Sequence, residues 1–410
     1  MRAFVTALPL AIAYLRERTM ATLLNIALLA LGIGTIIALL LTLNQAEQRM
    51  ERDAGGIDLV VGAKGSPLQL ILSAVFNVDI PTGNIPLADA MMISAEPMVK
   101  RAIPLSLGDS YRSFRIVGTN PAYLDLYDAK VDQGQIWDKP LEAVIGADVA
   151  RTTGLAVGSR FAGSHGLGEG GGDHGDRPFE VVGILKSTDS VVDRLAITSL
   201  DSVWQVHEHT PPAANTPPTK PVAPHKHEDE REITALLIQY ASPMAAVAFP
   251  RRVNAVSGLQ AASPAMETAR LFTLVGFGIS ALKLFAGIMM VCAALGIFIG
   301  LMNALNDRHA DLALLRVLGA DRATVVLTVL IQGFALGIAG VILGALLGHA
   351  GTEWMGTLVG KIHRVPLTGW VWAREEFWVI ASALILTLLA SLFPAWRAYR
   401  DAMPELLSRT

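Results

Sequence analysis

The chain has 410 residues, of which 52% are hydrophobic and 17% charged, with a formal net charge of −3 and a mean hydropathy of +0.45. Soluble proteins carry about a quarter charged residues, so this composition excludes an ordinary soluble protein. The near-neutral charge gives no sign of a nucleic-acid partner, and the single cysteine, Cys292, excludes internal disulfides and cysteine-based zinc or redox sites.

The first 43 residues predict a membrane anchor. Residues 1–20 are amphipathic and are expected to form an interfacial helix, and residues 21–43 are long and apolar enough for a first transmembrane helix. The apolar run exceeds the core of a typical secretory signal and ends in NQAEQRMERD, with no small-residue cleavage site. We therefore expect this span to be retained and its helix to continue through QAEQRMERDA.

Residues 44–270 are polar and rich in turns, which predicts a water-exposed α+β domain. Runs of β-branched residues closed by glycine or turn residues predict strands within residues 57–65, 111–120 and 177–188. The stretch 142–161 predicts a strand, a short helix and a second strand.

Two inserts interrupt this domain, at residues 163–178 and 205–232. The first is glycine-rich and the second proline-rich and then charged, so neither buries enough apolar surface to order itself, and both are expected to be flexible. Six of the nine histidines lie in or beside them. Imidazole and carboxylate groups suit zinc, nickel or copper, so a loosely held zinc ion is one hypothesis and a solvated, histidine-rich linker is the alternative that spacing alone favours. The candidate ligands are His207, His209, His225, His227 and Glu228.

Three further apolar spans follow the domain. SPAMETARLFTLV predicts a helical approach to the second span, and Lys283 and Gln332 are the main polar interruptions within the spans. Gly32, Gly34, Gly337, Gly340 and Gly344 are expected to allow close packing between helices. The expected segments are a stalk with the second transmembrane helix at 271–302, a polar segment at 303–322, the third helix at 323–349, a loop at 350–376, the fourth helix at 377–397 and a tail at 398–410.

The distribution of basic residues predicts the orientation. Four spans place both termini on one side, where nine arginines lie, whereas the loop between the third and fourth spans carries three basic residues. The positive-inside rule then predicts that the termini and residues 303–322 are cytoplasmic and that the large domain lies outside.

The stretch NDRHADLALLRVLGADR, residues 306–322, interrupts two apolar spans. Its leucines recur at helical spacing between charged residues, Gly319 suits a helix C-cap and Asp321 suits the N-cap of the third span. A helix this short is marginal alone and needs a surface to pack against. The residues by themselves leave open a connector at the lipid headgroups and a helix that docks on a partner.

RHADLALLRVLGADRATV resembles the E-I-A-L-L-R-A-L-G-A-S-R-R-Q-I stretch of the MacB/FtsX-type permeases, the type VII ABC transporter family. The layout of one span, a large domain and three spans is similar, as are FPAWRAYRDAMPELLSR, AVIGADVARTTGLAVGSRF and FEVVGILKSTDSVVDRLAITSL. In that family the stretch is a cytoplasmic coupling helix that docks on the ATPase, although Asp311 stands where glutamate is common. The resemblance implies coupling roles for Asp307, Arg308, Asp311, Leu314, Leu315, Arg316, Leu318, Gly319 and Ala320.

Motifs for catalysis are missing from the sequence: it has no G-x-x-x-x-G-K-[ST], no H-E-x-x-H and no G-x-S-x-G. We therefore expect no catalytic residues and no enzyme activity in this chain, with ATP and Mg²⁺ bound by a separate cytoplasmic ABC ATPase.

The resemblance implies a multi-pass permease of the bacterial inner membrane that transmits conformational change to a periplasmic domain. Its expected partners are the ATPase, a second copy or a paralogous permease, membrane lipid, and a periplasmic adaptor or substrate protein. Lipoprotein, lipid-linked, peptide and metal-related cargo all remain open. The alternative function is a zinc-responsive membrane sensor or binding protein without transport activity.

Overall fold

The computed structural model describes residues 2–166, 177–207, 231–307, 321–363 and 367–400. The chain divides into two compact units. The helical unit comprises residues 1–47 and 275–410, and the mixed unit comprises residues 48–274.

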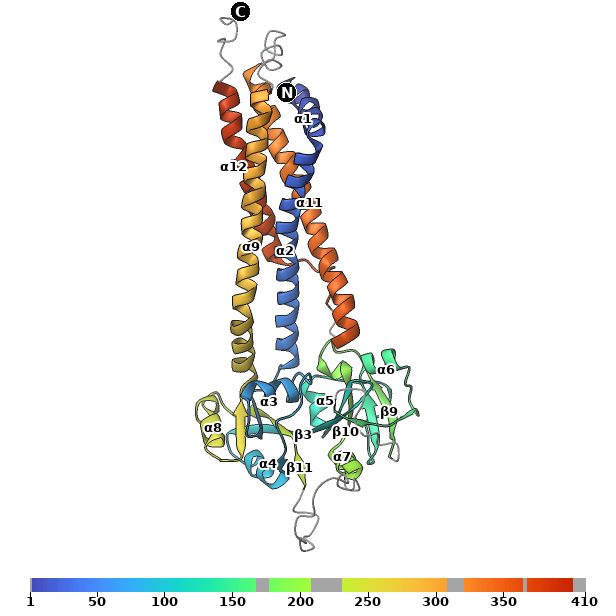
Figure 1. Cartoon of the computed structure of the whole chain (residues 1–410). Coiled ribbons are helices and arrows are strands. Elements are labelled where there is room, and N and C mark those ends of the chain that lie inside the picture. The colour runs from blue at the N-terminus through green and yellow to red at the C-terminus, as the bar shows by residue number, and fades with distance from the viewer. Residues whose placement is uncertain (1, 167–176, 208–230, 308–320, 364–366, 401–410) are drawn as a thin grey trace, which may run out of the picture. The chain divides into compact units, whose positions relative to one another are not determined.

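The helical unit is built from α1 (Arg2–Glu17), α2 (Thr19–Asp53), α9 (Pro264–Asp307), α11 (Arg322–His363) and α12 (Arg374–Arg400) (Figure 1). The last four contain segments long and apolar enough to cross a membrane, which confirms the expected one-plus-three arrangement. The predicted helical extensions are also confirmed, because α2 continues to Asp53 and α9 begins at Pro264. At 1.5 Å per residue α2 is about 52 Å long and α9 about 66 Å, well beyond a bilayer core of about 30 Å.

The α11 helix differs from the prediction, since residues 350–363, expected in a loop, continue the helix. The reason is packing on residues that follow the helix. Thr352 is fully buried, and the backbone at Leu367 lies so close to Gly356 that a Cβ there would collide with it.

Small residues set the spacing of the helical unit. On α11, Gly340, Gly344 and Gly348 pack directly against a stripe of α2 side chains, and Gly32 on α2 packs against Met290 of α9. These contacts confirm the predicted role of glycine in close helix packing. The α2 stripe consists of Leu29, Ile33 and Ile37, which are fully buried.

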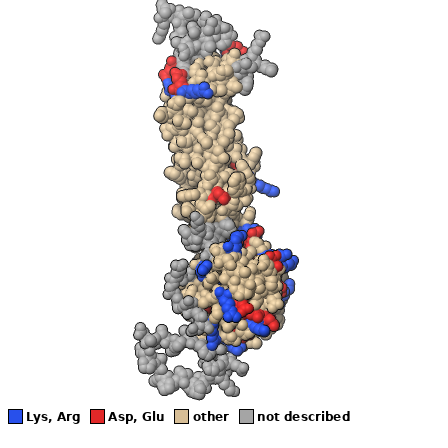
Figure 2. Space-filling view, turned by 90° about the vertical axis from the view of Figure 1, so that its right-hand side faces the viewer, with Lys and Arg blue, Asp and Glu red and all other residues tan. Residues whose placement is uncertain are grey.

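The surface of the helical unit suits lipid. Figure 2 shows that one face of this unit is uncharged over most of its length, whereas the mixed unit carries charges of both signs. Large apolar side chains on α9 are exposed, among them Phe277, Leu284 and Ile288.

The mixed unit is an α+β domain around one large sheet, as predicted. Its strands are ordered β13-β1-β12-β3-β4-β10-β6-β9-β5, with β7 paired to β9 and β8 to β3, and a separate pair β11-β2. The strands are β1 (Leu59–Ala63), β2 (Ile85–Pro86), β3 (Val99–Tyr111), β4 (Phe114–Thr119), β5 (Val131–Gly134), β6 (Glu142–Ile145), β7 (Arg160–Phe161), β8 (Ser164–His165), β9 (Phe179–Leu185), β10 (Leu195–Ser199), β11 (Glu232–Ile233), β12 (Ala235–Tyr240) and β13 (Leu259–Ala262).

Short helices cover this sheet, and the strands bury side chains on both faces. Val60 of β1 enters one hydrophobic cluster, and its neighbours Leu59 and Val61 enter another. Because successive side chains of a strand alternate in direction, a strand covered on both faces reads as a continuous apolar run. The helices are α3 (Pro67–Ala74), α4 (Leu87–Ser94), α5 (Ala122–Leu126), α6 (Ala147–Thr153), the 3₁₀ turn η1 (Val191–Arg194), α7 (Leu200–His207) and α8 (Ala245–Asn254).

The edges of the two inserts correct the predicted boundaries. Residues 164–165 were expected in a flexible loop but form β8, which is held by pairing with β3. Residues 205–207 belong to α7, and Glu232 begins β11. For β8 and β11, pairing with another strand supplies the order that local composition lacks.

Candidate functional site

Of the nine predicted coupling residues, the structure describes only Asp307, the last residue of α9. Asp307 forms an ion pair with Arg18, which separates α1 from α2. Asp321 caps α11 as predicted, because its carboxylate accepts a hydrogen bond from the Ala323 backbone N–H at 2.8 Å. The other eight predicted coupling residues lie outside the described residues, and their role stays a prediction. They are Arg308, Asp311, Leu314, Leu315, Arg316, Leu318, Gly319 and Ala320.

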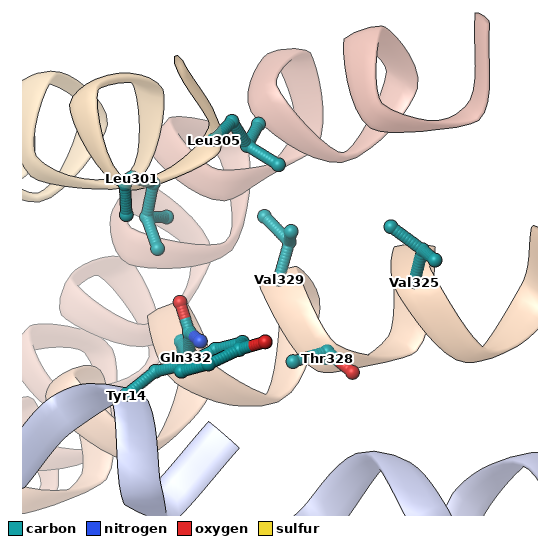
Figure 3. A pocket seen from close by; sticks show the side chains of 8 residues that line it. Tyr14, Leu301, Leu305, Val325, Thr328, Val329 and Gln332 are labelled. Carbon is teal, nitrogen blue, oxygen red and sulfur yellow. The ribbon is translucent and has the colours of Figure 1, made fainter. Parts of the chain in front are cut away.

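The helix ends that residues 308–320 join are packed against α1. Tyr14 of α1, Leu301 and Leu305 of α9, and Val325 and Val329 of α11 surround a cavity of about 20 Å³, which holds about one water molecule (Figure 3). Small-molecule sites are roughly 300 Å³ or larger, so this cavity is a packing gap. The ends of α9 and α11 are therefore packed against α1.

At the other end of the helical unit, a polar clamp holds the segment before α12. Gln45 of α2 exchanges two hydrogen bonds with the backbone of Thr368, at 2.8 and 2.9 Å, and Glu353 of α11 accepts one from the Thr368 hydroxyl at 3.0 Å. His349 lies 3.0 Å from the Glu376 carboxylate, which also accepts a bond from the Ala373 backbone N–H. These contacts tie α2, α11 and α12 together.

The helices α2 and α9 each contribute residues to both units and lead into neighbouring strands. Only Ser263 separates β13 from α9, and residues 54–58 separate α2 from β1. The strands β1 and β13 are paired antiparallel, with Val60 opposite Ala262. Both long helices are therefore continuous with one two-stranded edge of the sheet.

The last turn of α2 is anchored inside the mixed unit by polar contacts. Arg194 lies 3.3 Å from the Asp53 carboxylate, and both side chains are nearly buried. The Tyr127 hydroxyl donates a hydrogen bond to the Asp53 carbonyl at 2.8 Å. Burial raises the pKa of Tyr127, so that the hydroxyl keeps the proton it donates.

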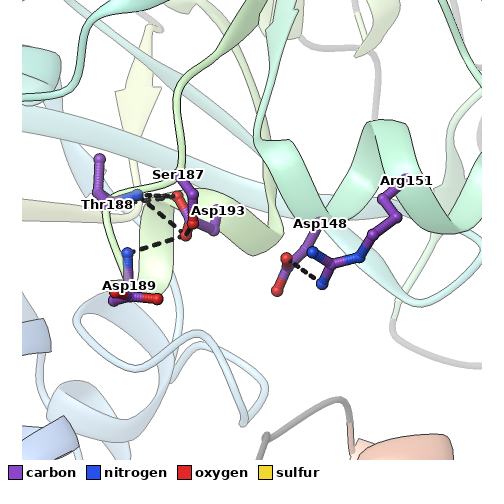
Figure 4. A network of polar contacts seen from close by, with 6 residues as sticks. All are labelled: Asp148, Arg151, Ser187, Thr188, Asp189 and Asp193. Carbon is purple, nitrogen blue, oxygen red and sulfur yellow. Dashed lines mark hydrogen bonds and ion pairs between the residues drawn. The ribbon is translucent and has the colours of Figure 1, made fainter.

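The loop that presents Arg194 is fixed by its neighbour Asp193. The buried Asp193 carboxylate accepts bonds from the Ser187 hydroxyl at 2.7 Å and from the backbone N–H groups of Thr188 at 2.8 Å and Asp189 at 2.9 Å (Figure 4). Charged acceptors make stronger hydrogen bonds than neutral ones. We infer that this network orients Arg194 toward Asp53.

A cluster of two histidines and an aspartate lies elsewhere in the mixed unit. Asp109 of β3 is buried, and its carboxylate oxygen lies 3.0 Å from Nδ1 of His165 on β8 and 3.7 Å from Nε2 of His207 at the end of α7. A hydrogen bond from the protonated His207 ring to the Asp109 carboxylate is the largest influence on His207 and raises its pKa, whereas burial lowers it.

This cluster includes one predicted metal ligand, His207. The other four, His209, His225, His227 and Glu228, lie outside the described residues, and their metal binding stays a prediction. Sequence reasoning did not select Asp109 or His165 as ligands. Asp109 sits in a strand with nothing local to mark it, and only the pairing of β3 with β8 places His165 opposite it.

Two family models match the sequence. Residues 22–256 match the MacB-like periplasmic core domain, and residues 283–403 match the FtsX-like permease C-terminal region. Together these matches cover every strand of the mixed unit except β13, and the larger part of each long helix.

Individual relatives match shorter stretches. The lipoprotein-releasing system transmembrane protein LolE of Haemophilus influenzae is 30% identical over 122 residues, which cover 26% of this chain and 29% of LolE. LolC of the same organism is 29% identical over 117 residues, covering 28% and 30%. The chain thus spans about three tenths of the length of these relatives. The crystal structure of the periplasmic region of MacB from Actinobacillus actinomycetemcomitans aligns with 54% of this chain and 95% of that one, at 12% identity and a TM-score of 0.33.

Proposed function

Because this chain belongs to the MacB/FtsX-type family of ABC transporter permeases, we propose that it carries motion from a separate cytoplasmic ATPase to its periplasmic domain. The chain is a multi-pass membrane protein, and permeases of this family work with a cytoplasmic ATPase and are themselves generally non-catalytic. The proposal adds that the membrane is the bacterial inner membrane, that the termini are cytoplasmic and that two copies, or one copy and a paralogous permease, act together.

The connection of α2 and α9 to paired strands is the observation that carries this proposal. Each helix is longer than a bilayer is thick, and each enters the sheet within a few residues of its end. A relative displacement of the two helices would act directly on the β1–β13 pair. The Asp53–Arg194 contact resists slipping at the end of α2.

The segment that receives motion from the ATPase would be residues 307–320, which the family resemblance identifies as the ATPase-docking segment. The ion pair of Asp307 with Arg18 and the packing around Tyr14 support a push that reaches α1 and the adjoining start of α2 as well as α9 and α11. Motion at one helix would then be shared by the helical unit.

The cargo we propose is a lipoprotein or another lipid-linked molecule. The names of the two relatives, both of a lipoprotein-releasing system, support this choice. Exposed methionines and a valine on α4 and at the start of α8 also support it, because flexible thioether side chains adapt to apolar ligands. An Arg252–Glu96 ion pair at 2.8 Å links α8 to the turn that follows α4. The exposed residues are Met91 and Met92 of α4, Met244 directly before α8, and Val247 of α8.

The test is co-purification of an ATPase with the full chain from its native membrane. The test variant reverses two charges, Asp311→Lys with Arg316→Glu. The matched control, Asp148→Lys with Arg151→Glu, reverses an ion pair on α6, where Arg151 is exposed. We expect ATP hydrolysis in the eluate of the native chain and the control, and its loss from the test variant.

Release of acyl-labelled lipoproteins from spheroplasts would test the cargo. We expect ATP-dependent release with the native chain and its loss with the charge-reversed variant. An ATPase that co-purifies without any lipoprotein release would refute the cargo and leave the coupling intact. If no ATPase accompanies the native chain, the transmission proposal fails.

A further inference from the structure

We propose that Asp109, His165 and His207 form a binding site for one divalent transition-metal ion, with Zn²⁺ as the principal occupant. The site lies wholly within the mixed unit and goes beyond the transport proposal, which neither requires it nor depends on it. It also differs from the predicted loop site, because two of its three ligands belong to strands.

The spacing of the ligand atoms fits a metal of this kind. One nitrogen from each histidine and one oxygen of Asp109 all lie within 4.8 Å of one another. Zinc bonds of about 2.0–2.2 Å in tetrahedral geometry separate neighbouring ligand atoms by roughly 3.3 Å. The two distances to the Asp109 oxygen, 3.0 and 3.7 Å, lie on either side of that value.

The orientation of His207 is set by a second contact. Its Nδ1 lies 2.8 Å from the Val203 carbonyl oxygen, one turn earlier in α7. A carbonyl only accepts, so Nδ1 carries a hydrogen. Nε2, the nitrogen that faces Asp109, then carries a lone pair for a metal when the ring is neutral and a second hydrogen when the ring is protonated. Metal-binding histidines commonly donate their other ring N–H to a backbone carbonyl, which fixes the tautomer and the ring orientation.

The secondary structure holds the other two ligands in place. Asp109 and His165 are directly opposite each other in the antiparallel pair of β3 and β8. The rings of His165 and His207 are 5.3 Å apart, and both side chains are partly exposed, whereas Asp109 is buried. A metal ion would therefore reach the site from solvent and fasten β8 and α7 to β3.

The donor set selects the class of metal. Two imidazoles and one carboxylate suit zinc, copper, nickel or ferrous iron, whereas calcium and magnesium require oxygen ligands. Three protein ligands leave a fourth position of a tetrahedral zinc for water or an added ligand.

The competing interpretation is that the histidines only satisfy the buried Asp109 carboxylate. A hydrogen-bonded His–Asp pair needs no metal, and the 3.0 Å contact is compatible with one. The two interpretations differ in stoichiometry and selectivity, since only the metal site takes up one Zn²⁺ per chain and discriminates against Ca²⁺.

The experiment is a zinc titration of the full chain in detergent, purified without a histidine tag, by calorimetry and by competition with a zinc chelator of known affinity. His165→Gln with His207→Gln removes two ligands, and Asp109→Asn removes the carboxylate charge. The matched control, His209→Gln with His225→Gln and His227→Gln, removes insert histidines and leaves the cluster intact.

We expect the native chain and the control to bind one Zn²⁺ with affinities within about twofold of each other, and the two cluster variants to bind at least about tenfold more weakly. Ca²⁺ should not compete. Absence of a zinc site in the native chain, or binding kept by the cluster variants and lost in the control, would overturn the proposal.

A second measurement separates loss of a ligand from loss of the fold. Co²⁺ replacing Zn²⁺ should give the visible absorption of a nitrogen- and oxygen-ligated ion in the native chain, and the Asp109→Asn variant should show a changed spectrum. Far-ultraviolet circular dichroism of each metal-free variant must match that of the native chain. An identical cobalt spectrum in a folded Asp109→Asn variant would exclude Asp109 as a ligand.

Discussion

Buried polar side chains bond to different kinds of partner in the helical unit and in the mixed unit. In the helical unit most buried hydroxyls bond within their own helix, as Thr328 does to Thr324 and Thr352 to Gly348, and neighbouring helices meet through glycine. In the mixed unit, buried polar groups link separate elements, as Arg194 does with Asp53. On the helical side, the clamp at Thr368 and Glu376 and the hydrogen bond from the Thr22 hydroxyl to the Leu15 carbonyl also link separate elements. The helical unit is thus held together mainly by close packing, and the mixed unit by polar links between its elements.

The largest expected effect comes from breaking the connection between the units. Insertion of Gly-Ser-Gly-Ser between Ser263 and Pro264 adds a flexible segment between β13 and α9. We expect lipoprotein release to fall about tenfold or more while the ATPase still co-purifies. The same insertion between Val157 and Gly158, in a turn before β7, serves as the control and should leave release near the native rate. Equal release from both variants would contradict transmission through this joint.

The next largest effect is expected inside the mixed unit. Asp193→Ala removes a buried carboxylate and leaves the N–H groups of Thr188 and Asp189 without their charged acceptor, which should lower the free energy of unfolding by about 3 kcal/mol. Hydrogen exchange of the full chain, read by mass spectrometry, should show faster exchange at β9, β10 and the end of α2. Asp148→Ala, which removes a surface ion pair, should cost about 0.5 kcal/mol. A similar response to both changes would refute the idea of a rigid anchor.

In the helical unit, a substitution that disturbs helix packing should lower the free energy of unfolding somewhat less than Asp193→Ala does in the mixed unit. Gly344→Leu would place its Cβ 2.7 Å from the Cβ of Ile33, so α2 and α11 must separate, at about 1–3 kcal/mol. Thermal unfolding in detergent should report this loss. Gly351→Leu, on the same helix but with open space around it, should unfold at close to the native temperature.

The smallest effect on stability is expected from removing a buried hydroxyl in the helical unit. Thr352 is buried, but its hydroxyl bonds to Gly348 of the same helix at 2.9 Å. Thr352→Val should therefore change the stability by only about 0.5 kcal/mol, far less than Asp193→Ala. A loss comparable to that of Asp193→Ala would mean that buried polar groups matter equally in the two units.

Local patterns were enough to predict most elements. The apolar runs located α2, α9, α11 and α12, and β-branched runs located β1, β4 and β9. Helix ends were less accurate, since α11 runs to His363 because of contacts with residues that follow it.

Long-range pairing could not be read from one sequence. Nothing near Leu59 indicates that β1 pairs with β13, and nothing near Asp109 indicates two histidines from β8 and α7. Both arrangements depend on the register of strands far apart in the chain. The predicted coupling residues show the opposite case, because a family motif predicted them while the structure describes only Asp307.

The joint at Ser263 also has a consequence for rotation. A single residue between a strand and a helix offers only two soft dihedral angles, and Pro264 at the start of α9 fixes its own φ. The helix therefore has little freedom to spin about its axis while the strand stays still. Rotation of α9 about its axis would therefore exert a torque on β13. The sheet would respond to rotation of the helix as well as to its displacement.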